Sequence, residues 1–103
     1  MELIKISDLN SIDDHSGKVV MVEDSVIALF KIQDEYFAID NVCTHRGGSL
    51  GDGEVTGVIV SCPWHGWEIN CKTGEAVENP NIKVKRYEII KKEDGIYIEW
   101  EED

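Results

Sequence analysis

The chain has 103 residues, a length that supports one modest hydrophobic core and leaves no room for a second catalytic domain. Its 21 acidic and 10 basic residues give a formal net charge of -11 at pH 7. This charge argues against nucleic acids and anionic membranes as partners, because their phosphates attract Lys and Arg. It favours a basic patch on another protein.

We expect neither a signal peptide nor a membrane span in this sequence. No apolar run approaches the roughly 18 residues of a membrane span, and MELIKISDLN has no cationic segment followed by an apolar one. Three cysteines are too few, and odd in number, for a disulfide framework. We therefore expect a cytoplasmic monomer, one domain over residues 1–103, whose thiols stay free for a metal.

Short β-favouring runs, separated by turn signals such as Gly51-Asp52-Gly53, recur along the whole chain. Alternation is clear at Ile96, Ile98 and Trp100, where every second side chain can face a core. The expected strands are 2–6, 18–23, 25–32, 36–40, 58–61, 67–70, 82–90 and 95–101. The pattern predicts an all-β fold, a small antiparallel sandwich or barrel.

Two Cys/His pairs lie close together in the middle of the chain. Cys43 and His45 form a Cys-x-His, Cys62 and His65 form a Cys-x-x-His, and sixteen residues separate the pairs. Thiolates and imidazoles suit zinc, copper or iron–sulfur chemistry better than hydrolysis or phosphate binding. Glycines crowd the segment between the pairs, which favours loops that fold around an inorganic group.

The four residue types alone are compatible with zinc and with an iron–sulfur cluster. Two cysteines and two histidines satisfy a tetrahedral zinc site. Zinc fingers usually keep the cysteines together and the histidines together, whereas here the order is Cys, His, Cys, His. This alternation favours a diiron cluster whose irons take unlike ligands, with zinc left as the alternative.

The two pairs resemble the ligand loops of the Rieske [2Fe-2S] family. The similarity extends to the run AIDNVCTH, to CPWHGW and to the turn KTG that follows it. It implies one [2Fe-2S] cluster, with Cys43 and Cys62 on one iron and His45 and His65 on the other, and no catalytic residue. It also implies a Rieske-like fold with a two-loop cluster-binding subdomain, its loops at about 41–50 and 61–70.

Four positions depart from the pattern of high-potential members of that family. Those proteins carry an extra, disulfide-bonded cysteine in each loop, where this chain has Gly48 and Trp64. They also place a Ser and a Tyr after the second loop, where this chain has Trp67 and Ile69. Because hydroxyl donors to sulfur stabilise the reduced cluster, their absence predicts a potential near the low end of the Rieske range, about -150 mV.

The resemblance implies a soluble one-electron carrier and not an enzyme. Such a Rieske-type ferredoxin would take an electron from a flavoprotein reductase and pass it to a terminal oxygenase. A second hypothesis is the Rieske-like small subunit of an assimilatory nitrite reductase. A third, from another class, is a zinc-stabilised binding module with no redox role.

The third cysteine and the third histidine are expected to bind no metal. Cys71 lies at the end of an expected strand and is interpreted as a small side chain at a turn. His15 lies in a polar turn and is interpreted as an exposed loop histidine. With one histidine outside the two pairs, the chain cannot supply the two histidines of a mononuclear oxygenase iron.

Overall fold

The computed structural model describes residues 2–8, 11–23, 25–41, 49–63 and 67–100. Within these residues the chain is almost entirely β-structure, as the sequence predicts. The elements are β1 (Glu2–Ser7), β2 (Ser16–Val22), β3 (Ser25–Ile32), β4 (Glu35–Asp40), the 3-10 helix η1 (Leu50–Asp52), β5 (Glu54–Thr56), β6 (Ile59–Ser61), β7 (Glu68–Asn70), β8 (Arg86–Tyr87), β9 (Ile89–Lys92) and β10 (Gly95–Trp100).

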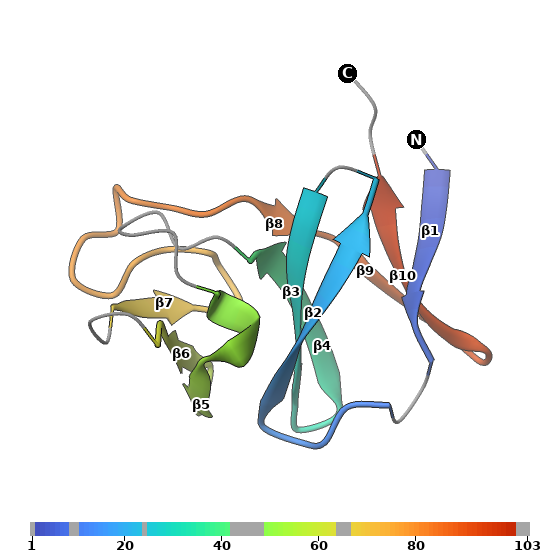
Figure 1. Cartoon of the computed structure of the whole chain (residues 1–103), viewed down its shortest axis with the longest axis horizontal. Coiled ribbons are helices and arrows are strands. Elements are labelled where there is room, and N and C mark those ends of the chain that lie inside the picture. The colour runs from blue at the N-terminus through green and yellow to red at the C-terminus, as the bar shows by residue number, and fades with distance from the viewer. Residues whose placement is uncertain (1, 9–10, 24, 42–48, 64–66, 101–103) are drawn as a thin grey trace.

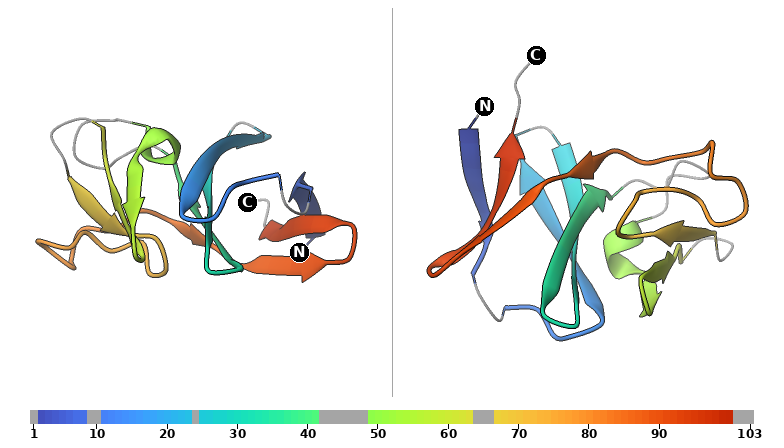
Figure 2. Two further views of the ribbon diagram at one scale, coloured as in Figure 1. Left: turned by 90° about the horizontal axis from the view of Figure 1, so that it is seen from below. Right: turned by 180° about the vertical axis from the view of Figure 1, so that it is seen from behind.

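The strands form three antiparallel sheets (Figure 1). A terminal sheet has the order β1-β10-β9, a middle sheet has the order β2-β3-β4-β8, and a small sheet has the order β5-β6-β7. In both views of Figure 2 the small sheet lies at one end of the molecule and the β9–β10 hairpin at the other. The antiparallel all-β prediction is therefore confirmed.

The middle sheet is buried on both of its faces. In β3, Ile27 and Leu29 join an apolar cluster shared with the terminal sheet, whereas Ala28, Phe30 and Ile32 join a second cluster shared with the small sheet. Successive side chains of a strand point to opposite faces, so one apolar run supplies both cores. This explains why residues 25–32 read as nearly continuous hydrophobic sequence.

Most of the expected strands are present, but the expected strand over 82–90 is wrong. Its residues are divided among all three parts of the fold. Lys83 bridges Glu75 beside the small sheet, residues 86–87 pair with β4, and residues 89–92 pair with β10. The alternating apolar residues Ile82 and Val84 pack on the second core without belonging to a continuous strand.

One short strand was not foreseen, and helical structure is minimal. β5, with the sequence Glu-Val-Thr, lies between glycine-containing turns and is too short to show an alternating pattern. The 3-10 helix η1 is the one helical element in the described part of the chain. No helix in that part has the length and apolar character needed to cross a membrane.

Leu50 packs in the core between the small sheet and the middle sheet, so its truncation should destabilise the fold. Its side chain is completely buried in the second core, so Leu50→Ala should lower the free energy of unfolding by about 2–5 kcal/mol. Leu3 is 43% exposed on β1 and provides the matched control, with a loss of about 0.5 kcal/mol or less for Leu3→Ala. Urea titration followed by circular dichroism measures both; equal losses would contradict the assignment of the core.

Candidate metal centre

The first expected ligand loop leaves the middle sheet after β4 and returns at η1, whereas the second connects β6 and β7 of the small sheet. One of the four expected ligands, Cys62, belongs to the described residues, and it follows β6 directly. Cys43, His45 and His65 lie outside the described residues, as do Gly48 and Trp64. The structure therefore describes the stems from which both loops leave, at residues 41 and 49 and at residues 63 and 67.

The stem of the second loop is closed by backbone pairing. Ser61 and Glu68 are the last paired residues of β6 and β7, and beyond them the backbone N–H of Cys62 donates to the carbonyl O of Trp67 over 2.7 Å. Cys62 is only 2% exposed. A soft sulfur donor is thus held, with little contact with water, at the point where the loop leaves the sheet.

The stem of the first loop is closed by the side chain of Asn41. Its amide nitrogen donates to Ser49 Oγ over 2.9 Å, and its Oδ1 accepts the backbone N–H of Gly51 over 2.6 Å. The backbone carbonyl of Asn41 accepts the N–H of Leu50 over 2.8 Å. A single buried side chain at the end of β4 therefore ties together the two ends of the loop.

Gly51 is required where η1 passes over the Asn41 side chain. A Cβ atom at this position would lie 2.7 Å from Val19 Cγ2 and 2.9 Å from Asn41 Oδ1. Both distances are shorter than real Cβ contacts, so a larger residue would displace the hydrogen-bonded carboxamide. Glycine here gives close backbone approach, as expected for a loop that folds around an inorganic group.

The two stems meet in one apolar cluster. Leu50, which ends the first loop, and Cys62, which starts the second, both belong to the core between the middle and small sheets. Figure 1 shows η1 beside the small sheet. This donor chemistry, with a buried thiol next to a glycine-containing stem, fits a cluster held between two loops.

Two positions that lack hydroxyl groups contribute to packing instead. Ile69 is completely buried in the core under the small sheet, and Trp67 is half-buried against the same core. Their side chains thus support the second stem as hydrophobic contacts. Neither side chain brings a hydroxyl group to the stem.

Cys71 and His15 lie as the sequence predicts. Cys71 is completely buried in the core, and burial raises the pKa of its thiol to about 12, so the thiol stays protonated at neutral pH. His15 is exposed in a loop, with its Nδ1 3.3 Å from Asp14 Oδ2. In the described part of the chain, no three His, Cys, Asp or Glu side chains are grouped so that they could hold a metal ion.

Comparison with known proteins gives a match to the model of the Rieske [2Fe-2S] domain over residues 2–88. The chain is 30% identical over 73 residues to Ferredoxin CarAc of Metapseudomonas resinovorans, covering 70% of this chain and 68% of that protein. It is 35% identical over 71 residues to the ferredoxin component of the naphthalene 1,2-dioxygenase/salicylate 5-hydroxylase systems of Ralstonia sp, covering 68% of each.

Solved structures match nearly the whole chain. The Sphingomonas yanoikuyae B1 ferredoxin superposes with a TM-score of 0.89 at 28% identity, covering 97% of this chain and 100% of that one. A chain in the complex of reduced oxygenase and oxidized ferredoxin in carbazole 1,9a-dioxygenase gives 0.85 at 26% identity, covering 93% and 100%. A nitrite reductase small subunit gives 0.86 at 18% identity, covering 97% and 100%, which shows a shared fold alone.

Asn41 should decide how firmly the first loop holds its metal. Asn41→Ala leaves the buried N–H of Gly51 without its acceptor, at a cost of about 1–3 kcal/mol, so purified protein should contain less iron per chain. Asn79, whose Oδ1 accepts the N–H of Asn81 in an exposed turn, is the matched control. Iron analysis should show full occupancy for Asn79→Ala, and an unchanged iron content in Asn41→Ala would contradict the assigned role.

Proposed function

Because this chain belongs to the Rieske [2Fe-2S] domain family, as an electron-transfer ferredoxin with one [2Fe-2S] cluster, we propose that it carries single electrons from a flavoprotein reductase to a terminal oxygenase. The observation that carries the proposal is the arrangement of the two loop stems, which contribute Leu50 and Cys62 to one core between the middle and small sheets. When bound, the cluster takes up and releases one electron. The family assignment sets aside the zinc-stabilised binding module.

The proposed ligands are one cysteine and one histidine from each loop. Cys43 and Cys62 bind one iron as thiolates, and His45 and His65 bind the other as neutral imidazoles. The position of Cys62, buried at the stem beside Leu50, supports this assignment for the second loop. Two imidazoles in place of two thiolates leave the site less negative, which favours reduction relative to a site with four cysteines.

The side chains around the stems keep water from the thiolate side of the site. Cys62 is packed into the core, with Leu50 and Ile69 in the same cluster. A low local dielectric makes charge changes at this site sensitive to nearby fixed charges and dipoles. The chain's own contribution is therefore to hold the ligands rigidly and to determine the polarity around them.

The proposed partners are proteins with basic docking surfaces. The net charge of -11 favours association with such surfaces and speeds encounter at low ionic strength. The resemblance to a ferredoxin chain solved together with its oxygenase supports an oxygenase as acceptor. We further propose that the protein works as a cytoplasmic monomer, with residues 1–103 as a single Rieske domain.

A role as the small subunit of a nitrite reductase is the second candidate. It is supported by a similar fold at 18% identity, whereas the ferredoxin relatives match at 30% and 35%. Copurification with a large sirohaem subunit would favour that candidate over a mobile carrier.

The cluster can be tested with a pair of cysteine variants. Dithionite-reduced protein should give a rhombic EPR signal with an average g value below that of all-cysteine clusters. Cys62→Ser should lose this signal and the visible absorption, because it removes a proposed thiolate ligand. Cys71→Ser, a change of the same kind at a buried thiol assigned to packing, should keep both.

Two results would contradict the proposal. Protein that is replete with metal but EPR-silent after reduction would exclude a Rieske cluster. Loss of the signal in Cys71→Ser, in a protein that remains folded, would show that the ligands are misassigned.

The midpoint potential should be negative against hydrogen, near the low end of the Rieske range of about -150 mV. The physical reason is that Trp67 and Ile69 pack on the core and offer no hydroxyl group to the sulfur atoms, so the reduced state is stabilised less. Redox titration monitored by circular dichroism measures it. A midpoint above roughly +100 mV, in the upper part of that range, would overturn the argument.

A further inference from the structure

Tyr87 and Asp40 form a hydrogen bond at the end of the strand that leads into the first ligand loop. The Tyr87 hydroxyl donates to Asp40 Oδ1 over 2.7 Å, between β8 and the last residue of β4. The two strands pair through Ala38 and Tyr87, and the backbone N–H of Asp40 donates to the carbonyl O of Lys85 over 2.9 Å. Asp40 is therefore held through both its side chain and its backbone.

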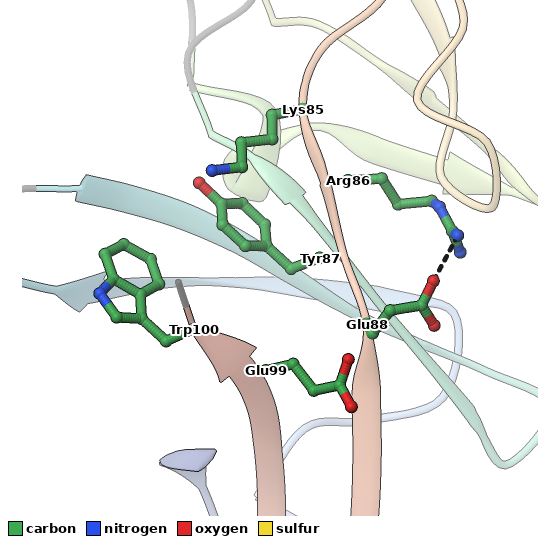
Figure 3. Close-up of a pocket in the computed structure, with 6 residues that line it drawn as sticks. All are labelled: Lys85, Arg86, Tyr87, Glu88, Glu99 and Trp100. Carbon is green, nitrogen blue, oxygen red and sulfur yellow. Dashed lines mark hydrogen bonds and ion pairs between the residues drawn. The ribbon is translucent and has the colours of Figure 1, made fainter. Parts of the chain in front are cut away.

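The Tyr87 ring is fixed by its neighbours. Trp100 stacks on it, with ring centroids 6.0 Å apart and planes inclined by 9°. Lys85 Nζ lies 5.1 Å from the centre of the Tyr87 ring and 6.0 Å from that of Trp100. Figure 3 shows the Lys85 side chain extended over the phenol ring, with its amine near the hydroxyl. A ring held in this way keeps its hydroxyl in one place.

The hydroxyl of Tyr87 remains protonated at working pH. Burial raises the pKa of the Tyr87 phenol, and the hydrogen bond to Asp40 raises it further. Tyr87 is 6% exposed, so few water molecules compete for the carboxylate from that side. The pair therefore consists of a permanent donor and a half-buried anion.

The Asp40 charge lies near the proposed cluster because of the covalent chain. Asp40 precedes Cys43 by three residues. Since consecutive Cα atoms are 3.8 Å apart, the two Cα atoms lie within about 11 Å of each other. This distance is comparable to the Debye length of about 8–10 Å. A carboxylate held in a partly buried position therefore influences the addition of an electron to the cluster that Cys43 is proposed to bind.

We propose that Tyr87 is a positioning residue that holds the Asp40 carboxylate at the entrance of the first ligand loop, where its negative charge keeps the potential of the cluster low. The inference rests on the proposed function. A fixed anion opposes the addition of an electron. Without the Tyr87 hydroxyl, the carboxylate turns to water, where solvent screens its charge.

A double-mutant cycle tests the proposal by its effect on the midpoint potential. Asp40→Asn removes the charge but keeps an oxygen that can accept from Tyr87, and it should raise the potential. Tyr87→Phe should raise the potential in the same direction. Because Tyr87 acts through Asp40, adding Tyr87→Phe to Asp40→Asn should cause no further shift.

The chain offers a matched control on the β9–β10 hairpin. The Tyr97 hydroxyl donates to Asp94 Oδ2 over 2.9 Å in an exposed position, and Figure 1 shows this hairpin at the end of the molecule away from the small sheet. Tyr97→Phe and Asp94→Asn make the same chemical changes, including the same change in net charge. Both should leave the potential and the EPR signal unchanged.

The outcomes separate this inference from the proposed function. No shift in Asp40→Asn, or an equal shift in Asp94→Asn, would overturn the role of the fixed charge even if the cluster and its EPR signal are normal. An undiminished Tyr87→Phe shift in the Asp40→Asn background would show that Tyr87 acts by another route. If Tyr87→Phe does not fold, the comparison of the midpoint potentials of Asp40→Asn and Asp94→Asn still tests the role of the fixed charge. A chain that binds no cluster at all would overturn the proposed function itself.

Discussion

Burial of the middle sheet on both faces is the constraint on which the rest of the molecule depends. Two sheets that do not pair with each other are attached to opposite faces of β3 and β4, through side chains that alternate along each strand. A shift of the β3–β4 register by one residue would turn the side chains of one face to the other face, so that neither core would keep its apolar residues. The position of the small sheet, and with it the two loop stems, is thus fixed by the same pairing that stabilises the terminal sheet.

Where the strand pairing stops at the site, further hydrogen bonds hold the two stems, from a side chain in one stem and from the backbone in the other. After Asp40, β4 has no further strand partner, and Asn41 uses its side chain to bond Ser49 and Gly51. After Ser61, the second loop is closed by one backbone bond from Cys62. The two stems therefore differ in what holds them, because the first loop returns to a 3-10 turn and the second returns to a neighbouring strand.

The sequence predicted those elements in which local pattern and tertiary pairing agree. Residues 25–32 form a strand with the expected ends, and Ile96, Ile98 and Trp100 are buried as their alternation indicated. The prediction of one strand over residues 82–90 is wrong, because the backbone of this segment pairs in turn with three partners. Its apolar residues are also divided between the two cores, with Val84 in the core shared with the small sheet and Tyr87 in the core shared with the terminal sheet. The period of apolar residues indicates which side chains are buried, but it does not indicate which strands the backbone of the segment pairs with.

The metal-binding residue types could be recognised from the sequence, but the polar contacts around the stems could not. Asn41 and Asp40 are polar residues of a kind that is common where a loop begins, so the sequence gives no sign of their partners. These partners, Gly51 and Tyr87, lie ten and 47 residues away in the sequence. The two neighbouring residues bond to different parts of the molecule. Asp40 accepts from Tyr87, a member of the core shared with the terminal sheet, while Asn41 bonds to Ser49 and Gly51 at the other end of the first loop. The start of the first loop is therefore anchored on both sides. The packing of Tyr87 against Trp100 can thus affect the proposed metal site, although neither residue is a proposed ligand.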